Sequence, residues 1–193
     1  MLILGLAGSP RRNGNTEILL DEALAGAKAA GAETEKIVLS TLKFSPCISC
    51  GNCEKTGNCI LQDDMQAVYE KIIAADVMIF ATPNYFYNVS AWAKAAIDRS
   101  QALWSRKHVL KDPRMRLNKP GYMISVGATK GRKLFKGTML TMQYFFEAAG
   151  YKQAGSLLIR GVDAKGDILK YPDYLNAAVE LGREAAAQEA CSP

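Results

Sequence analysis

The fold is decided by residues 2–16, which read LILGLAGSPRRNGNT. The first half, Leu2–Gly8, is a continuous apolar run ending in glycine, typical of a strand buried on both faces of a parallel sheet. The second half combines small residues, hydroxyls, amides and arginines ahead of a helix that Asn15 or Thr16 can cap. A helix N-terminus presents unpaired N–H groups and a positive dipole end, so this loop predicts a phosphate site.

Two well-known nucleotide loops are excluded by the residues of this segment. The chain has no GxxxxGK[ST], so the loop is not a P-loop, and no GxGxxG, so it is not a dinucleotide-binding Rossmann turn. An ordinary polar strand-to-helix turn with a good cap remains the alternative. The candidate phosphate ligands are Ser9, Arg11, Asn13, Asn15 and Thr16.

Strand and helix patterns alternate along the rest of the chain. Strands are predicted at 2–8, 35–40, 76–82, 121–126 and 155–160, and helices at 15–30, 63–75, 90–105, 131–149 and 171–190. Strands that are each followed by a helix imply a parallel sheet wrapped on both sides. We therefore expect a single α/β domain over 1–193 with a cysteine-rich insert at 45–60.

Length and composition are those of an ordinary globular protein. The chain has 193 residues, 49% hydrophobic and 22% charged. No apolar run approaches the ~20 residues of a membrane span, and the first run is too short for the apolar core of a signal peptide. We expect a cytoplasmic protein that makes no contact with a membrane.

Three segments together resemble a known family. They are GSPRRNGNT (8–16), ATPNYFYNVS (81–90) and SVGATKG (125–131), each placed after a predicted strand. They resemble the flavin-binding loops of the NAD(P)H-dependent FMN reductase and flavodoxin-like superfamily. The resemblance implies a flavodoxin-like three-layer sandwich with strand order 2-1-3-4-5 and FMN bound beyond the carboxyl ends of the strands. The FMN-binding residues so implied are Ser9, Arg11, Asn13, Asn15, Thr16, Pro83, Asn84, Tyr85, Phe86, Tyr87, Ser125, Gly127, Ala128 and Thr129.

The second and third loops suit the flat ring system of a flavin. Aromatic side chains at 85, 86 and 87 can flank an isoalloxazine, and backbone N–H groups of 84–88 and 127–129 can hydrogen-bond its polar edge. Such hydrogen bonds tune the redox behaviour of a flavin. The alternative for the three aromatic side chains is packing beneath the loop.

Four of the five cysteines lie within thirteen residues, spaced C-x2-C-x2-C-x5-C at Cys47, Cys50, Cys53 and Cys59. In a cytosolic protein, such a group indicates metal or redox chemistry rather than a disulfide scaffold. Thiolates in tandem CxxC steps can converge on a cubane, and Gly51 and Gly57 permit sharp turns. Cys191 is expected to be a bystander.

The spacing also resembles that of the iron–sulfur flavoproteins, a subfamily with one [4Fe–4S] cluster and one FMN per subunit. That resemblance implies that all four cysteines are cluster ligands. Two alternatives stay open. One is a zinc site, although two pairs sharing Cys50 would crowd a tetrahedron. The other is an empty loop whose thiols are free or paired as disulfides.

Basic residues are concentrated in one stretch of a chain with net charge +5. They are Arg106, Lys107, Lys111, Arg114, Arg116, Lys119, Lys130, Arg132, Lys133 and Lys136. The stretch is either a solvated face or a docking surface for an acidic redox partner such as ferredoxin, or for the phosphates of NADPH. A nucleic-acid partner is not expected, because Tyr122 and Phe135 occupy predicted core positions rather than exposed ones.

Other side chains do not suggest catalysis. His108 is the only histidine and is expected at the surface, and no Ser-His-Asp or GxSxG pattern occurs. Asp63 and Asp64 are interpreted as helix caps. Trp92 and Trp104 are expected in core or subunit-interface packing, and the flanks rich in aromatic residues predict a homo-oligomer, either a dimer or a tetramer.

These features together predict an FMN-dependent oxidoreductase in electron transfer that relays electrons between FMN and a [4Fe–4S] cluster. No side chain is predicted to act as a catalytic acid or base. The alternatives are an NAD(P)H-dependent FMN or quinone reductase without a cluster, and a flavodoxin-like electron carrier. The physiological donor and acceptor are not encoded in any motif.

Overall fold

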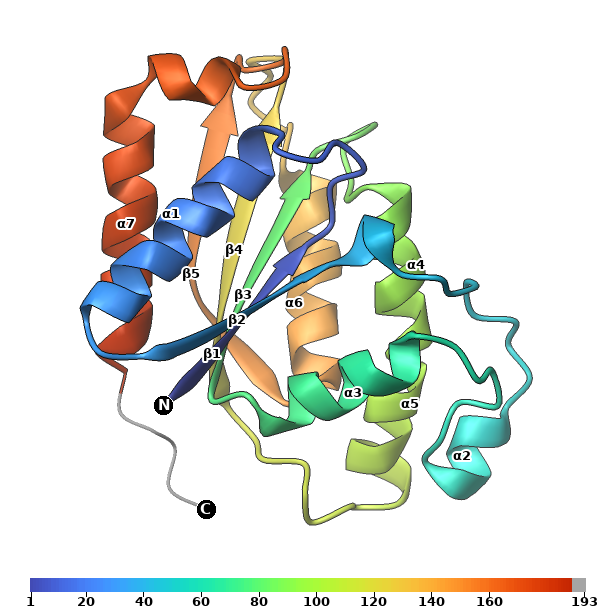
Figure 1. Cartoon of the computed structure of the whole chain (residues 1–193). Helices are drawn as coiled ribbons and strands as arrows, with labels where there is room; N and C mark the ends of the chain where they lie inside the picture. Colours follow the sequence, from blue (N-terminus) through green and yellow to red (C-terminus); the bar gives the residue numbers. More distant parts are fainter. Residues whose placement is uncertain (189–193) are drawn as a thin grey trace.

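A computed structural model describes residues 1–188, in which five parallel strands form one sheet with helices on both faces (Figure 1). The strands are β1 (Leu2–Ala7), β2 (Glu33–Val38), β3 (Val77–Pro83), β4 (Lys119–Gly127) and β5 (Tyr151–Arg160). Their order is β2-β1-β3-β4-β5, and every neighbouring pair is parallel. The predicted fold class and strand order are confirmed.

The apolar runs of the inner strands supply two separate cores. Successive side chains of a strand point to opposite faces, so Met78 and Phe80 join one core while Val77 and Ile79 join the other. This two-sided burial explains why the central strand reads as a continuous apolar run.

Each core is closed by its own set of helices. On one face lie α1 (Asn15–Ala29) and α7 (Pro172–Ala186), and on the other lie α3 (Met65–Ala74), α4 (Ala91–Arg99), α5 (Gln101–Trp104) and α6 (Lys136–Ala148). α1 and α7 approach so closely that a Cβ on Gly182 would overlap the carbonyl of Ala23. The first loop therefore leads into a helix that is firmly packed.

Several element bounds differ from the sequence prediction. β2 begins at Glu33 rather than at Glu35, because the ladder to β1 fixes this edge strand although its side chains are mostly polar. The helix predicted over 131–149 begins only at Lys136, after a run of turns. The helix predicted over 90–105 is broken after Arg99, resumes as α5, and continues as the π-helix η2 (Ser105–Val109).

In the described part of the chain, three short helices lie in the segments that connect the longer elements. They are the 3₁₀ turns η1 (Leu39–Thr41) and η3 (Asp167–Lys170), and α2 (Asn52–Thr56), which lies inside the cysteine insert and was not predicted. The final helix was predicted to reach Ala190. Its described part ends at Ala186, and Cys191 lies outside the described residues.

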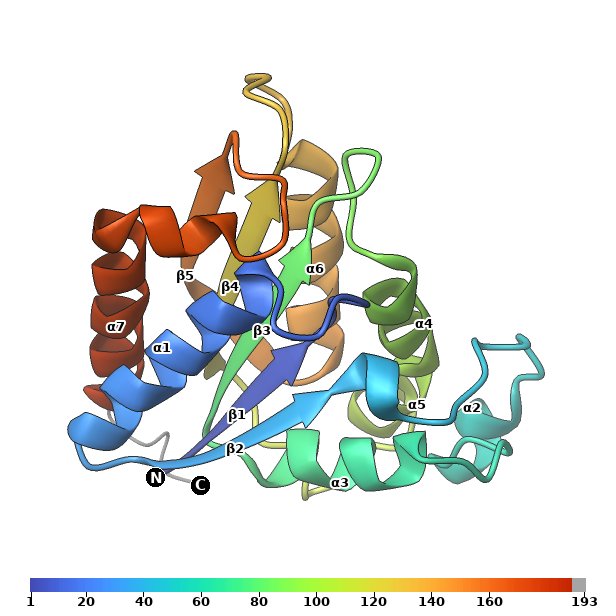
Figure 2. The ribbon, with the colours of Figure 1, turned by 45° about the horizontal axis from the view of Figure 1, so that its top comes forward.

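Two regions stand out from the layered body. The loops that follow β1, β3, β4 and β5 lie at one edge of the sheet, whereas the cysteine insert, which contains α2, projects sideways from the body (Figure 2). Among the described residues, no helix has the length and apolarity needed to cross a membrane.

Candidate functional site

The loops at the carboxyl edge of the sheet enclose a small pocket of about 100 Å³. Parallel strands bring their carboxyl ends to one edge, where ligands of open α/β sheets bind. The pocket is lined by Ser9, Arg11, Gly14, Asn15, Thr16, Pro83, Asn84, Tyr85, Val126, Ala128, Val162 and Asp163. All three predicted flavin loops therefore contribute to one site.

The phosphate-loop end of this pocket has free hydrogen-bond donors. Thr16 lies in the first turn of α1 with only 3% of its surface exposed, and its hydroxyl has no hydrogen-bond partner among residues 1–188. The N–H groups of a first helical turn also lack intrahelical partners. An anion at the N-terminus of α1 would satisfy both kinds of donor.

Other predicted phosphate ligands hold the loop in shape. Ser9 Oγ accepts a hydrogen bond from the Arg11 N–H at 3.1 Å. Arg11 Nη1 and Asn15 Nδ2 donate to the carbonyls of Asp163 and Ala164 at 3.0 and 2.9 Å. Asn13 is exposed and does not line the pocket. Of the five predicted residues, Thr16 is the side chain most available to a ligand.

Glu17 is a supporting residue that sequence reasoning missed. Its carboxylate is almost fully buried, accepts a hydrogen bond from the Asn13 N–H at 2.7 Å, and pairs with Arg12 and Lys36. Burial opposes its ionisation, but these hydrogen bonds and charges prevail and lower the pKa of Glu17. A glutamate two residues after Asn15 that reaches back across the helix start is the signal that could have revealed it.

The second loop is a tight hairpin with unusual backbone angles. Tyr85 and Asn88 exchange both backbone hydrogen bonds, at 2.8 and 3.0 Å. Between them, Phe86 and Tyr87 have φ values of 49° and 63°, a left-handed conformation that bulky side chains rarely adopt. Such local strain marks candidate functional loops.

Only part of the aromatic cluster faces the pocket. Pro83, Asn84 and Tyr85 line it, whereas Phe86 is fully exposed and Tyr87 is half exposed. Asn84 Nδ2 donates to Thr138 Oγ1 at 2.6 Å and to the Leu134 carbonyl at 2.9 Å. Asn84 therefore ties the second loop to the segment that follows the third.

The third loop contributes mainly backbone. Ala128 lines the pocket, and Thr129 is exposed outside it. Ser125 is buried in β4 and donates to the Thr82 carbonyl at 2.8 Å. Gly127 leaves no room for a side chain, since a Cβ there would lie 2.7 Å from Leu134 Cδ2.

A fourth loop, after β5, was not predicted to belong to the site. Val162 and Asp163 line the pocket, and the 161–168 segment holds Asn15 by both its amide nitrogen and its amide oxygen. The strand order could have revealed this loop, because β5 ends at the same edge as the others.

The cysteine insert encloses a second and larger cavity of about 410 Å³. All four clustered cysteines line it, together with residues of α4 and α5. Gly51 and Gly57 flank α2 with φ values of 71° and 72°, which are the sharp turns that the sequence predicted. The insert therefore surrounds a cavity rather than packing onto itself.

The donor set of this cavity fits a thiolate-bound cluster. Four cysteines are the usual ligands of a [4Fe–4S] group, and Ser49 N–H already donates to Cys47 Sγ at 3.4 Å. The described cysteines are all free thiols, and none of their groupings is close enough to hold a single metal ion. The structure thus shows four thiols facing one cavity without a closed coordination shell.

Asp63 has a larger role than the predicted helix cap. It does accept a hydrogen bond from the Met65 N–H at 3.2 Å, but both its oxygens also bind the buried Arg99, at 2.7 and 2.9 Å. Burial opposes its ionisation, yet the hydrogen bonds from Arg99 and the Ser45 amide lower the pKa of Asp63. Asp64 accepts from the Lys43 N–H at 2.7 Å.

The basic stretch is divided by the fold into two parts. In the first part, Arg114 pairs with Asp112, Arg116 pairs with Asp76, and Lys119 is buried against carbonyls of α3. In the second part, 130–136, the basic side chains are exposed beside the flavin-loop hairpin and have no ion-pair partner within residues 1–188. Most of the unpaired charge that a docking surface requires therefore lies in this second part, with exposed Lys111 the exception in the first.

His108, Trp92 and Trp104 line neither the pocket at the strand ends nor the cysteine cavity. His108 is at the surface beside Glu147, with Nε2 and Oε1 3.1 Å apart. Trp92 packs against Phe44, and Trp104 packs against His108 with 37% of its surface exposed. The expectation of a surface histidine is confirmed.

Comparisons with known proteins place the chain in a flavin-dependent family. Residues 1–148 match the model of the NADPH-dependent FMN reductase family. The chain is 40% identical over 130 residues to an iron-sulfur flavoprotein of Methanosarcina thermophila, an alignment that covers 67% of this chain and 65% of that protein. It is 38% identical to an iron-sulfur flavoprotein of Methanocaldococcus jannaschii over 67% of this chain and 64% of the relative. The matched part thus spans less than two thirds of these relatives.

One further relative and one solved structure match this chain over nearly its whole length. A putative NAD(P)H-dependent FMN-containing oxidoreductase of Bacillus subtilis is 31% identical over 97% of this chain and 99% of its own length. Among solved structures, an NAD(P)H:quinone oxidoreductase from Methanothermobacter marburgensis superposes with a TM-score of 0.78 over 98% of both chains, at 18% identity. This last likeness supports the fold.

Proposed function

Because the chain belongs to the NADPH-dependent FMN reductase family, we propose that it is an FMN-dependent oxidoreductase that passes electrons between FMN and a [4Fe–4S] cluster. The observation that carries the proposal is the coexistence of two sites in one chain. One is a pocket at the strand ends with unpaired hydrogen-bond donors that could bind a phosphate. The other is a cavity lined by four cysteines. Relatives at 36–40% identity that are named iron-sulfur flavoproteins support the second site.

The chain's own residues would bind and orient FMN. The Thr16 hydroxyl and the first turn of α1 would bind the phosphate, and Tyr85 would contact the ring system from the hairpin side. Backbone N–H groups of 84–88 and 127–129 would hydrogen-bond its polar edge. No acid or base is needed from the protein, since the redox chemistry belongs to the flavin and its surroundings tune it.

The four cysteines would bind the cluster through their sulfurs. An iron–sulfur cluster, when bound, supplies one-electron exchange, whereas FMN can also accept electrons in pairs. A protein that holds both therefore connects donors of electron pairs to single-electron acceptors. Free surface-accessible thiols of this kind suit the reducing cytoplasm, where we place the protein.

Anaerobic kinetics with a cysteine variant test the relay. The flavin is reduced by dithionite and the protein is then mixed with a one-electron acceptor, comparing the native chain with Cys50→Ala. We expect the variant to take up electrons on the flavin at the native rate and to deliver them to the acceptor far more slowly. Equal delivery by both proteins would contradict the relay.

A reductase without a cluster is the second candidate. The end-to-end match to the Bacillus oxidoreductase and the open arrangement of the described cysteines favour it. Iron-free protein that oxidises NAD(P)H in steady state with a quinone or free flavin as acceptor would establish this candidate instead.

We further propose an acidic redox partner, which would dock on the exposed basic side chains of 130–136.

We also propose that the chain forms a homo-oligomer. Leu140, Tyr144 and Trp104 expose apolar surface along α5 and α6, around a groove of about 370 Å³ between these helices and α4. A second copy would cover this face. Light scattering of the flavin-bound protein tests the oligomer, and a monomer at micromolar concentration would overturn it.

A further inference from the structure

Two buried arginines lie beneath the cysteine insert. Arg99 ends α4 and Arg106 lies in the π-helix η2, seven positions later, with 1% and 4% of their surfaces exposed. A buried guanidinium requires an acceptor for each of its N–H groups. Their acceptors show which part of the molecule these arginines hold.

Arg99 holds both ends of the insert with a complete set of hydrogen bonds. Nη1 donates to the Ser45 carbonyl at 2.8 Å, and Nη2 is oriented to the Leu61 carbonyl at 3.4 Å. The remaining donors bind the Asp63 carboxylate and, through Nε, the Tyr69 hydroxyl at 3.2 Å. All five guanidinium N–H groups thus have acceptors, and two of these acceptors lie immediately outside the four cysteines.

Arg106 holds the turn between the third and fourth cysteines. Nε donates to the Gly57 carbonyl at 2.7 Å, and Nη2 donates to Asn58 Oδ1 at 2.8 Å. Gly57 has a left-handed backbone, and a Cβ there would lie 3.1 Å from Arg106 Cγ. The arginine stem and the turn therefore pack directly against each other.

The buried side chain of Arg99 lies close to the cysteine cavity and to Cys59. Arg99 lines the cavity together with Cys59, whereas its partner Asp63 is not among the lining residues. Four thiolates bring negative charge to this space, and reduction of a bound cluster adds more. A buried cation at its wall offsets that charge in a region of low dielectric.

We propose that Arg99 and Arg106 are positioning residues of the cysteine site. They hold the insert open around its cavity before metal enters, and the Arg99 charge favours the reduced state of the bound cluster. The inference rests on the proposed cluster function and extends it to residues outside the cysteine motif. Lysine cannot replace Arg99 in this role, because an ammonium is a single point donor without the planar fork.

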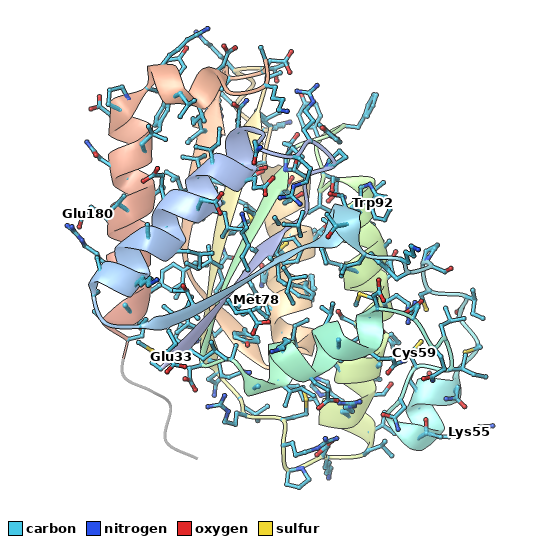
Figure 3. The ribbon with its side chains drawn as sticks, viewed as in Figure 1. Glu33, Lys55, Cys59, Met78, Trp92 and Glu180 are labelled. Carbon is cyan, nitrogen blue, oxygen red and sulfur yellow. The ribbon has the colours of Figure 1, made fainter. Side chains whose placement is uncertain are left out.

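Metal loading of matched variants provides the first test. Apo-protein is titrated anaerobically with Co²⁺ and separately reconstituted with ferrous iron and sulfide, using the native chain, Arg99→Lys and Lys55→Ala. Lys55 is the control because it is a cation of the same insert that is exposed and points away from the body (Figure 3). We expect Arg99→Lys to bind metal about 10–100-fold more weakly, as supporting partners of metal ligands usually do, and Lys55→Ala to be unchanged.

The cluster potential distinguishes a tuning role from mere folding. Replacing Arg99→Met together with Asp63→Leu removes the ion pair without leaving a lone buried charge. The reconstituted double variant should have a more negative midpoint potential than native protein, with an unchanged flavin potential. An unchanged cluster potential would overturn the charge role.

A metal-free measurement separates this inference from the proposed function. Hydrogen exchange of residues 47–60 in apo-protein should be faster in Arg99→Lys and in Arg106→Lys than in the native chain, whether or not a cluster is ever bound. A native chain that takes up neither Co²⁺ nor iron would refute the cluster function alone. Exchange and metal affinity equal to native in both variants would overturn the positioning role, and Arg106→Lys decides it if Arg99→Lys fails to fold.

Discussion

The pocket at the strand ends, where we propose that FMN binds and which we call the flavin pocket, is built differently from the cysteine cavity. The pocket gathers four loops from the carboxyl ends of β1, β3, β4 and β5, so the sheet itself fixes its walls. The cavity is formed by one insert that lies beside the sheet and rests on α4, α5 and η2. Side chains hold the insert in place, chiefly Arg99 at its two ends and Arg106 at the turn before Cys59.

The difference implies that a substitution that disrupts one site leaves the other site intact. A change in the cysteine insert leaves the strand ends in place, and a change in the phosphate loop does not reach the arginines below the insert. The predictions that follow test this independence in both directions.

The largest expected effect is the loss of all iron from a single cysteine variant. Cys50→Ala removes one of four ligands, and the cluster should be lost entirely, while FMN affinity stays within about twofold because the two cavities share no lining residue. Iron and sulfide analysis beside an FMN titration measures both. A large loss of FMN affinity would show that the sites are coupled.

The reverse variant is Thr16→Val, which keeps the side-chain volume and removes the free hydroxyl of the phosphate loop. Losing one hydrogen bond to a phosphate costs about 1–2 kcal/mol, so the Kd for FMN should rise roughly 5–30-fold. Iron content should not change. Titration of the apoprotein with FMN gives the answer, and an unaltered Kd would mean that the phosphate binds elsewhere.

Acid should loosen the cysteine insert. The folded-state pKa of Asp63 is lowered by Arg99 and the Ser45 amide, so its contribution to stability is present above the unfolded pKa of ~3.9 and is lost as pH falls through the lower folded value. Below about pH 4, the amides of 45–62 should therefore lose protection, measured as hydrogen exchange relative to the intrinsic rate at the same pH.

The matched control for this acid effect is Asp63→Asn. The variant should show the loosened insert already at neutral pH and little further change on acidification. If the protection of the native insert stays unchanged as Asp63 becomes protonated, the Arg99–Asp63 pair does not hold it.

The smallest expected effect concerns charge at the flavin side. Lys133 belongs to the unpaired basic part of the chain, whereas Arg114 is paired with Asp112. Electron-transfer rates with an acidic donor should fall as salt rises, since the Debye length shrinks from ~10 Å at 0.1 M to ~3 Å at 1 M. Lys133→Ala should reduce this salt dependence modestly and Arg114→Ala should leave it intact. Rates insensitive to salt would make the patch a solvated face.

Much of the fold could be predicted from sequence because both faces of the inner strands are buried. Continuous apolar runs such as 77–80 have one clear interpretation, and their loops then fall at a common edge. The bounds of edge strand β2 were harder to predict, because most of its side chains are polar and its position depends on pairing with β1. The break in the helix after Arg99 could not be predicted, because residues 99–105 contain neither glycine nor proline.

The sites were predictable to different extents. The loops after β1, β3 and β4 follow from motif and topology, but the roles within them do not, since Asn15 and Asn84 turn out to bind neighbouring backbone. The cysteines were evident from spacing alone. Arg99 and Arg106 were not, because only tertiary structure shows that a charged residue on a helix is buried against a loop 36 to 54 positions earlier.

The most direct test of the account is the composition of protein purified without oxygen. FMN, iron and sulfide are quantified per chain beside the visible spectrum. The account predicts brown protein with one FMN and about four irons per chain, as the cubane requires. Yellow protein that is free of iron and fully active as an oxidoreductase would contradict it.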